Sequence, residues 1–171
     1  MRYSGIIKDD IVNGLGIRSS LFVSGCRNHC KGCFNKNAQD FDYGNIFTEE
    51  VMQDFIDSVD APYYNGITLL GGDPMEPENA NELIPLVEEF RKKYGNSKTI
   101  WIYTGYLYED ILDLPNTDVR KILLLKADVL VDGPFIESLR DITLKFRGSS
   151  NQRIIDCNKS CRENIVLLEE E

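Results

Sequence analysis

Four short apolar runs, rich in β-branched and aromatic residues, recur along the chain. They cover residues 20–24, 67–70, 99–103 and 128–132, and a glycine-containing loop follows each of them. Runs of this length and composition are typical of strands that are buried within a sheet. The pattern therefore predicts four buried strands.

Amphipathic helical patterns lie between these runs. The first begins after Thr48, a good N-cap residue, carries two acidic residues in its first turn and is expected to end near Pro62. The second begins around residues 79–82 and ends with three basic residues and a glycine. Pro85 is expected to be tolerated only within the first turn of that helix.

The alternation of strands and helices predicts an α/β fold. A third helical pattern covers residues 107–125 and is expected to break at Pro115. Strands joined through helices pair in parallel with right-handed crossovers, and their binding loops gather beyond the carboxyl ends of the strands. Because 171 residues are too few for an eight-unit barrel, we expect one domain built as an open, partial (βα) barrel with mostly parallel strands.

Composition and charge narrow the functional classes. Apolar residues make up 42% of the chain and charged residues 27%, which is the balance of a globular protein. A net charge of -9 argues against nucleic-acid binding. The first residues resemble no secretory signal and no run reaches membrane-spanning length, so we expect a cytoplasmic protein without a membrane partner. Its five cysteines should then stay reduced.

Three of the cysteines, Cys26, Cys30 and Cys33, are spaced C-x3-C-x2-C directly after a predicted strand. Three thiolates in one short loop are typical of a metal centre, and iron-sulfur clusters are normally held by four. With three ligands, one iron of a 4Fe-4S cluster would remain open to a substrate. The alternative is a structural zinc site completed by His29 or by a cysteine of the C-terminal tail. Otherwise we assign His29 no role and interpret the tail cysteines, Cys157 and Cys161, as ordinary thiols.

A second candidate site follows the next predicted strand. Gly71, Gly72, Asp73 and Pro74 stand where glycines let a ligand approach the backbone, although the same residues also make an ordinary turn. Two further strand ends supply hydroxyl, carboxylate and aromatic groups to the same predicted edge, namely 103–106 and 132–135. A nucleoside could bind there.

The order of six motifs resembles the radical S-adenosylmethionine superfamily, and more closely the activators of anaerobic ribonucleoside-triphosphate reductase. They span about the first 155 residues and read IVNGLGIRSSLFVSGC, CKGCFNK, LLGGDP, IWIYTGY, VLVDGPF and FRGSSNQR. The resemblance implies a radical S-adenosylmethionine activase domain over residues 1–155, with residues 156–171 as a C-terminal tail. The tail carries a terminal acidic run, 169–171.

The resemblance also implies the chemistry. Cys26, Cys30 and Cys33 would hold a 4Fe-4S cluster that cleaves S-adenosylmethionine reductively, and the 5′-deoxyadenosyl radical would abstract hydrogen from a glycine of the reductase. A flavodoxin- or ferredoxin-type protein would donate the electron. The implied cofactor-binding residues lie in the cysteine loop, in the glycine–aspartate turn and at two other strand ends: Gly32, Cys33, Phe34, Gly71, Gly72, Asp73, Pro74, Tyr103, Thr104 and Asp132.

Several alternatives stay open at the level of sequence. One is an activator of another glycyl radical enzyme, such as pyruvate formate-lyase, and another is a non-catalytic iron-sulfur or zinc module. For four polar residues of the RGSSNQR motif, partner docking or cofactor contact stands beside a simple polar turn: Arg147, Asn151, Gln152 and Arg153.

Overall fold

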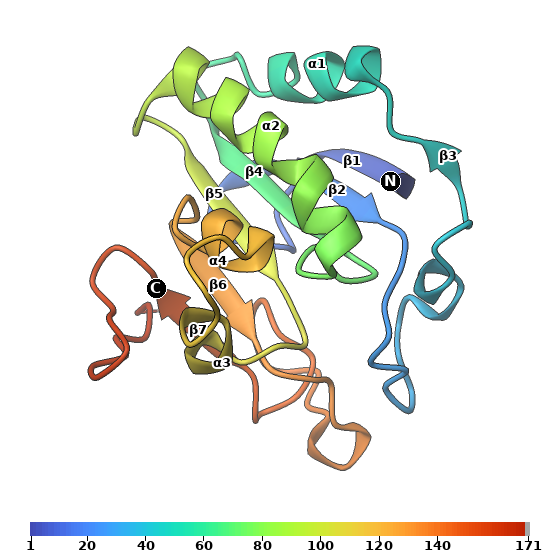
Figure 1. Cartoon of the computed structure of the whole chain (residues 1–171), viewed down its shortest axis with the longest axis vertical. Helices are drawn as coiled ribbons and strands as arrows, with labels where there is room; N and C mark the ends of the chain where they lie inside the picture. The colour runs from blue at the N-terminus through green and yellow to red at the C-terminus, as the bar shows by residue number, and fades with distance from the viewer. Residues whose placement is uncertain (170–171) are drawn as a thin grey trace.

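A computed structural model describes residues 1–169 as one seven-stranded sheet with helices packed on it. The strand order is β3-β1-β2-β4-β5-β6-β7 (Figure 1). The four central strands run parallel: β2 (Ile17–Val23), β4 (Tyr64–Gly71), β5 (Thr99–Tyr103) and β6 (Val129–Asp132). The sheet is open, because β3 and β7 form its two edges. An α/β fold with a parallel centre and an open sheet is therefore confirmed.

The outer strands are antiparallel and were not predicted. On one side β1 (Arg2–Asp10) pairs with β2 and with the short β3 (Asn45–Ile46), and on the other side β7 (Arg153–Asp156) pairs with β6. Most residues of β1 are exposed or half-buried. Such a strand lacks the continuous apolar run that marks a buried strand, so the hydrophobic pattern did not predict it.

The helices follow the predicted patterns, but the first ends at Asp57 and not near Pro62, and the placement of Pro85 in the second was wrong. In α1 (Glu49–Asp57) the Thr48 hydroxyl accepts a hydrogen bond from the Val51 backbone at 3.2 Å, as expected of an N-cap. However, α2 (Pro77–Tyr94) begins earlier than expected and holds Pro85 in its interior, so the restriction of Pro85 to the first turn was wrong. Pro85 is exposed, so solvent can satisfy the backbone carbonyl that the proline leaves without a donor.

The third helical pattern splits around Pro115 as predicted. It forms α3 (Tyr108–Leu112) and α4 (Val119–Leu124), and two short 3-10 turns complete the helical segments, η1 (Lys36–Gln39) and η2 (Glu137–Leu139). Within residues 1–169, every helix is too short or too polar to cross a bilayer.

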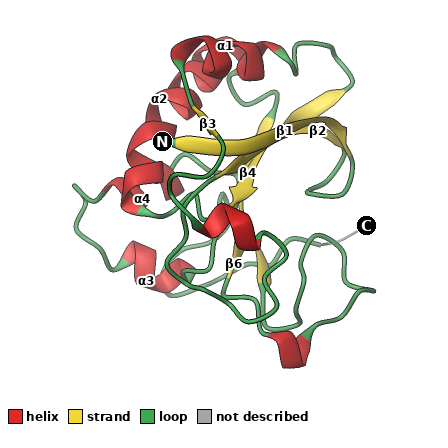
Figure 2. Cartoon of the chain, turned by 90° about the vertical axis from the view of Figure 1, so that its right-hand side faces the viewer, coloured by secondary structure: helices red, strands yellow, loops and turns green. Residues whose placement is uncertain are grey.

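The core is divided by the sheet. Helices α1, α2 and α4 cover one face (Figure 2), where they bury the larger apolar cluster around residues such as Leu69, Phe90 and Ile102. A smaller cluster of Trp101, Val129, Val131 and Ile154 lies apart from it. Along β5, Trp101 stands between Ile100 and Ile102 of the larger cluster, and along β6, Val131 follows Leu130 of that cluster. Because successive side chains of a strand point to opposite faces, the smaller cluster occupies the opposite face of the sheet.

The C-terminal segment packs along the sheet. The boundary expected between residues 155 and 156 falls inside β7, and Ile155 is fully buried. Beyond β7 the chain folds back, since the Asp156 backbone donates to Val166 and the Leu168 backbone donates to Ile154. Glu170 and Glu171, the last two residues of the expected acidic run, lie outside the described residues.

Arg153 joins β7 to the rest of the fold. Its guanidinium donates two hydrogen bonds to Glu109, at 2.9 and 2.7 Å, and also bonds the fully buried carboxylate of Asp132. These hydrogen bonds lower the pKa of Glu109 to about 2. A carboxyl group whose folded pKa lies below its ordinary value of 4.5 stabilises the fold above that pH, and the contribution is lost as the pH falls towards 2.

We therefore expect Glu109→Gln to lower the free energy of unfolding at pH 7 by about 1–3 kcal/mol, because the pair is only partly exposed. The difference from the wild type should shrink as the pH falls from 4.5 towards 2. Urea melts at several pH values measure it, with Glu82→Gln on the exposed face of α2 as the control. A pH-independent difference would contradict the assignment.

Candidate iron-sulfur and ligand site

The cysteine loop leaves the carboxyl end of β2 and is closed at its base. The Gly25 backbone donates to Ala38 at 2.7 Å, and the Cys26 backbone donates to Gln39 at 3.0 Å. Gly25 has a φ of 105°, and a Cβ there would meet the Phe41 ring at 2.3 Å, so only glycine fits. The sequence thus folds residues 26–39 into a compact loop at the edge where the parallel strands end.

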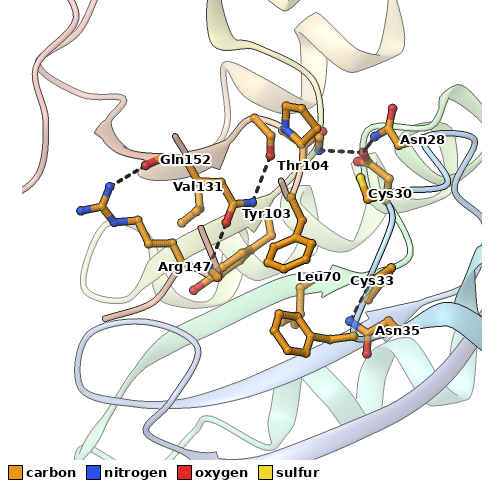
Figure 3. Close-up of a pocket in the computed structure, with 18 of the residues that line it drawn as sticks. Asn28, Cys30, Cys33, Asn35, Leu70, Tyr103, Thr104, Val131, Arg147 and Gln152 are labelled. Carbon is orange, nitrogen blue, oxygen red and sulfur yellow. Dashed lines mark hydrogen bonds between the residues drawn. The ribbon is translucent and has the colours of Figure 1, made fainter. Parts of the chain in front are cut away.

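All three predicted cysteines line one cavity of about 550 Å³. In Figure 3, Cys30 and Cys33 lie on one side of it, opposite Arg147 and Gln152. Burial is the main cause that raises the pKa of Cys26 to about 11, and the negative charges of Asp73 and Glu76 add to it. The thiolate form of this residue therefore needs a nearby cation, such as an iron ion, to be favoured.

The donor set fits an iron-sulfur cluster. Three thiols of one loop face a common cavity, which is the chemistry that such clusters require. Among the described residues, no three His, Cys, Asp or Glu side chains converge as on a single metal ion. A cluster does not need that convergence, because each thiolate binds a different iron.

The glycine–aspartate turn is fastened to the cysteine loop by backbone hydrogen bonds. The Gly72 backbone donates to Val23 at 2.7 Å, and the Asp73 backbone donates to Gly25 at 2.8 Å. In addition, the Asn35 amide donates to the Gly71 carbonyl at 3.3 Å. Gly71, Gly72 and Asp73 line the cavity, so the structure brings these predicted residues beside the cysteines. Pro74 is buried in the turn and does not line it.

Asp73 is a buried acid in the wall of the cavity. Its carboxylate accepts hydrogen bonds from the backbones of Met75 at 2.8 Å and Gly105 at 2.9 Å, and from the Asn28 amide at 3.3 Å. Burial nevertheless raises its pKa to about 6. This carboxylate therefore ties three loops together and presents negative charge to the cavity at neutral pH.

Two of the other predicted strand-end residues lie in the same cavity. Tyr103 and Thr104 line it, and the buried Tyr103 hydroxyl has no hydrogen-bond partner among residues 1–169. Asp132 does not line the cavity, because its carboxylate accepts bonds from Arg153 and from the Tyr108 backbone. Sequence placed all three residues at one edge but could not indicate which side chains were already engaged.

Phe34 and Gly32, two residues of the cysteine loop that were predicted to bind the cofactor, differ in their position relative to the cavity. Phe34 lines the cavity, with its ring centroid 5.1 Å from that of Phe135. Gly32 lies outside the lining, against Phe135 and Glu137. Its φ of 75° explains why a glycine occupies this tight position between two cysteines.

The RGSSNQR motif forms a turn that is fastened by its own side chains. Arg147 donates to the Gln152 carbonyl at 2.6 Å, the Gln152 amide oxygen accepts from the Gly148 backbone, and Asn151 donates to Pro134. Arg147 and Gln152 also line the cavity, whereas Arg153 is engaged with acids of the fold. The motif therefore forms a turn, and two of its residues, Arg147 and Gln152, stand in the wall of the cavity.

Sequence reasoning missed several residues of the cavity. Asn28 and Asn35 were overlooked inside the cysteine loop, where only the cysteines, His29, Gly32 and Phe34 were considered. The segment after β6 contributes further residues that belong to none of the six motifs: Arg140, Asp141, Ile142 and Leu144. Their only signal was the position of the segment after a strand end.

A salt-bridged clamp holds the cysteine loop against the start of α2. The Arg27 backbone donates to the buried Glu76 at 2.8 Å, and the Arg27 guanidinium bonds both Glu76 and Glu78. The guanidinium also lies 4.5 Å from the centroid of the Phe41 ring. The loop is thus fixed at a residue adjacent to Cys26.

Comparison with known proteins identifies the family. Residues 12–155 match the family model described as a 4Fe-4S single cluster domain. The chain is 36% identical over 156 residues to the anaerobic ribonucleoside-triphosphate reductase-activating protein of Haemophilus influenzae, which covers 90% of this chain and 97% of that protein. The chain belongs to the anaerobic ribonucleoside-triphosphate reductase-activating protein family.

Other members of the activating-protein family match over the same extent. The protein of enterobacteria phage T4 is 37% identical over 154 residues, covering 90% of this chain and 93% of that protein. The protein of Escherichia coli K12 is 38% identical over 154 residues, covering 89% of this chain and 96% of that protein. The matched 4Fe-4S domain contains the cysteine loop, the glycine–aspartate turn and all the residues that line the cavity.

Proposed function

We propose that this chain activates an anaerobic ribonucleoside-triphosphate reductase by cleaving S-adenosylmethionine reductively at a 4Fe-4S cluster. The 5′-deoxyadenosyl radical would abstract a hydrogen atom from a glycine of the reductase. The observation that carries the proposal is that Cys26, Cys30 and Cys33 face one cavity together with Gly71, Gly72 and Asp73. Membership of the activating-protein family supports the same assignment.

In this proposal the three cysteines would each hold one iron, and the fourth iron stays open. When bound and reduced, the cluster supplies the electron that splits S-adenosylmethionine into methionine and the 5′-deoxyadenosyl radical. The chain keeps the loop in place through the Arg27–Glu76 clamp and the closed loop base. The half-buried position of the cysteines limits the access of water.

The residues around the cysteines suit the polar groups of S-adenosylmethionine. The turn at Gly71 and Gly72 lets a ligand approach the backbone, and the Asp73 carboxylate complements a cationic amine. The unpartnered hydroxyl of Tyr103 and the side chain of Thr104 suit the nucleoside, with Phe34 as an apolar wall. We leave Asp132, Pro74 and Gly32 out of the direct contacts and assign them to the shape of the loops.

The fold is proposed to be a partial barrel of the radical S-adenosylmethionine type, because the cavity lies on an open α/β sheet at the carboxyl ends of parallel strands. A flavodoxin- or ferredoxin-type protein would supply the electron in the cytoplasm, where thiols stay reduced. The net charge of -9 supports a function without nucleic acid, and we assign the protein no membrane partner.

The test begins with anaerobic reconstitution using iron and sulfide, followed by chemical reduction and addition of S-adenosylmethionine. We expect stoichiometric methionine and 5′-deoxyadenosine, and a glycyl radical detected by electron paramagnetic resonance when the reductase is present. Repeating the assay with pyruvate formate-lyase in place of the reductase tests the alternative that the chain activates that enzyme. Full cluster loading without 5′-deoxyadenosine would overturn the proposal in favour of an electron-transfer or structural-metal module.

A further inference from the structure

Glu76, at the start of α2, turns its side chain away from its own helix. It is the N-cap residue of α2, but its carboxylate makes no capping hydrogen bond within the described first turn of that helix. The side chain reaches the cysteine loop instead, where one oxygen accepts the Arg27 backbone N–H at 2.8 Å. The other oxygen accepts a hydrogen bond from the Arg27 guanidinium at 2.6 Å. Both oxygens are therefore committed to the residue that follows Cys26.

Three charged groups meet here, and they differ in exposure. The side chain of Glu76 is 1% exposed, whereas those of Arg27 and Glu78 are 56% and 53% exposed. The Arg27 guanidinium also bonds Glu78, at 2.9 and 2.5 Å, so it bridges one buried and one exposed carboxylate. We call these three residues the charged triplet. One positive and two negative groups leave the triplet with a net charge of -1.

The start of α2 holds the chain on both sides of Cys26. Besides the bonds of Glu76 to Arg27, the Asn79 amide donates to the Ser24 carbonyl at 3.0 Å. Figure 1 shows this end of α2 beside the loop that leaves β2. Burial is the first cause that raises the pKa of the Cys26 thiol, and the negative charge of Glu76 adds to it. The charge of Glu76 therefore acts on a candidate iron ligand.

Charges near an iron-sulfur cluster change how easily the cluster is reduced. Reduction adds one electron, so a nearby positive charge favours the reduced state and a nearby negative charge disfavours it. The reduction potentials of such clusters accordingly depend on net charge and on exposure to solvent. A buried charge acts more strongly than an exposed one, because water and salt screen it less. Within the triplet, the two glutamates should therefore differ in their effect, although both bind the same guanidinium.

Resting on the cluster-bearing function proposed above, we propose that the charges of Glu76 and Arg27 set the reduction potential of the cluster. The buried carboxylate of Glu76 disfavours the reduced state, and the Arg27 guanidinium offsets that effect. Neither residue lines the cavity, so both act on the cluster from outside the space that a substrate would fill. They are positioning residues and not catalytic ones.

The test places glutamine at each position, because this change removes a charge and keeps the anchor of the loop. In Glu76→Gln the amide oxygen can still accept the backbone N–H of residue 27, and in Arg27→Gln that bond to Glu76 is unchanged. The reduction potential of each reconstituted protein is measured by anaerobic titration without S-adenosylmethionine. Electron paramagnetic resonance reports the fraction of reduced cluster.

We expect Glu76→Gln to raise the potential and Arg27→Gln to lower it. For Glu76→Gln the ratio of reduced to oxidised cluster at a fixed potential should rise about tenfold, which is about 59 mV for one electron. The double variant Arg27→Gln/Glu76→Gln has the same net charge as the wild type. Its potential should therefore return close to the wild-type value.

Glu78→Gln is the matched control. It removes the same charge from the same guanidinium, but at an exposed position. Its effect on the ratio of reduced to oxidised cluster should stay below about threefold and should vanish at about 1 M salt, where exposed charges are screened. The shift in Glu76→Gln should persist at that salt concentration, because the side chain is buried.

The sign of the shifts decides between a charge effect and damage to the loop. Shifts of the same sign in Glu76→Gln and Arg27→Gln would overturn the inference, and so would a shift in Glu78→Gln as large as that in Glu76→Gln. Opposite shifts in a protein that forms no 5′-deoxyadenosine would leave the charge effect standing and overturn the proposed reaction. Formation of 5′-deoxyadenosine together with shifts of the same sign would do the reverse.

Discussion

Replacing Cys30 by alanine is expected to abolish both the cluster and the formation of 5′-deoxyadenosine. Cys30 is one of three thiols that line the cavity, and its loss would leave only two of the three ligands proposed for the cluster. Removing a residue that only supports a metal ligand typically costs 10–100-fold, so loss of the ligand itself should reduce turnover by roughly 100-fold or more. Iron and sulfide analysis, the visible absorption of the cluster and the yield of 5′-deoxyadenosine measure the effect.

Cys161→Ala provides a matched control for this experiment. Cys161 is a free and exposed thiol in the C-terminal segment, and it does not line the cavity. This variant should retain the iron content and turnover of the wild type. If Cys161→Ala instead lost the metal while Cys30→Ala kept it, the cysteine loop could not be the cluster site. Zinc that is bound by the wild type and lost in Cys30→Ala would support the structural-metal alternative.

Replacing Gly72 by alanine is expected to separate the two loops that build the site. A Cβ at this position would meet the Gly25 carbonyl oxygen at 2.6 Å and the Ala38 carbonyl oxygen at 2.7 Å. Both contacts are with backbone, which cannot move aside as a flexible side chain can. We expect the free energy of unfolding of the protein to fall by about 1–3 kcal/mol or more, as for other overpacked sites. In a chain of this size a loss of about 1–3 kcal/mol should lower the Tm by about 2–12 °C.

The same substitution should also weaken the cluster, because the Gly72 and Asp73 backbones donate to Val23 and Gly25 at the base of the cysteine loop. Gly5→Ala in β1 is the control, since a Cβ there has no neighbour within 4 Å and Gly5 has no positive φ. That change should leave stability unaltered or raise it by about 0.4–1 kcal/mol. A Gly72→Ala protein with normal Tm and normal iron content would show that the loops can adjust.

The sequence alone was most informative where one local rule governs the structure. The buried strands at 67–70 and 99–103 followed from their apolar runs, and Thr48 followed from the capping preference of threonine. The cysteine spacing identified the candidate cluster site before any fold was known. These signals are short in sequence, so no tertiary contact is needed to find them.

Tertiary packing overrode local rules at two kinds of position. Pro85 sits inside α2 because the helix is held by its buried face and can leave one carbonyl to solvent. Strands β1 and β7 form because the parallel centre of the sheet offers edges to pair with, although β1 has no buried-strand pattern of its own. Partner strands are distant in sequence, so single-chain patterns do not reveal them.

By itself the sequence determined the α/β class, the cysteine loop and the glycine turn, because each depends on residues that are adjacent in the chain. Only the tertiary structure decided which polar side chains are available to a ligand. Asp132 and Asp73 are both aspartates at strand ends. The Asp132 carboxylate is already paired with Arg153, whereas Asp73 lines the cavity.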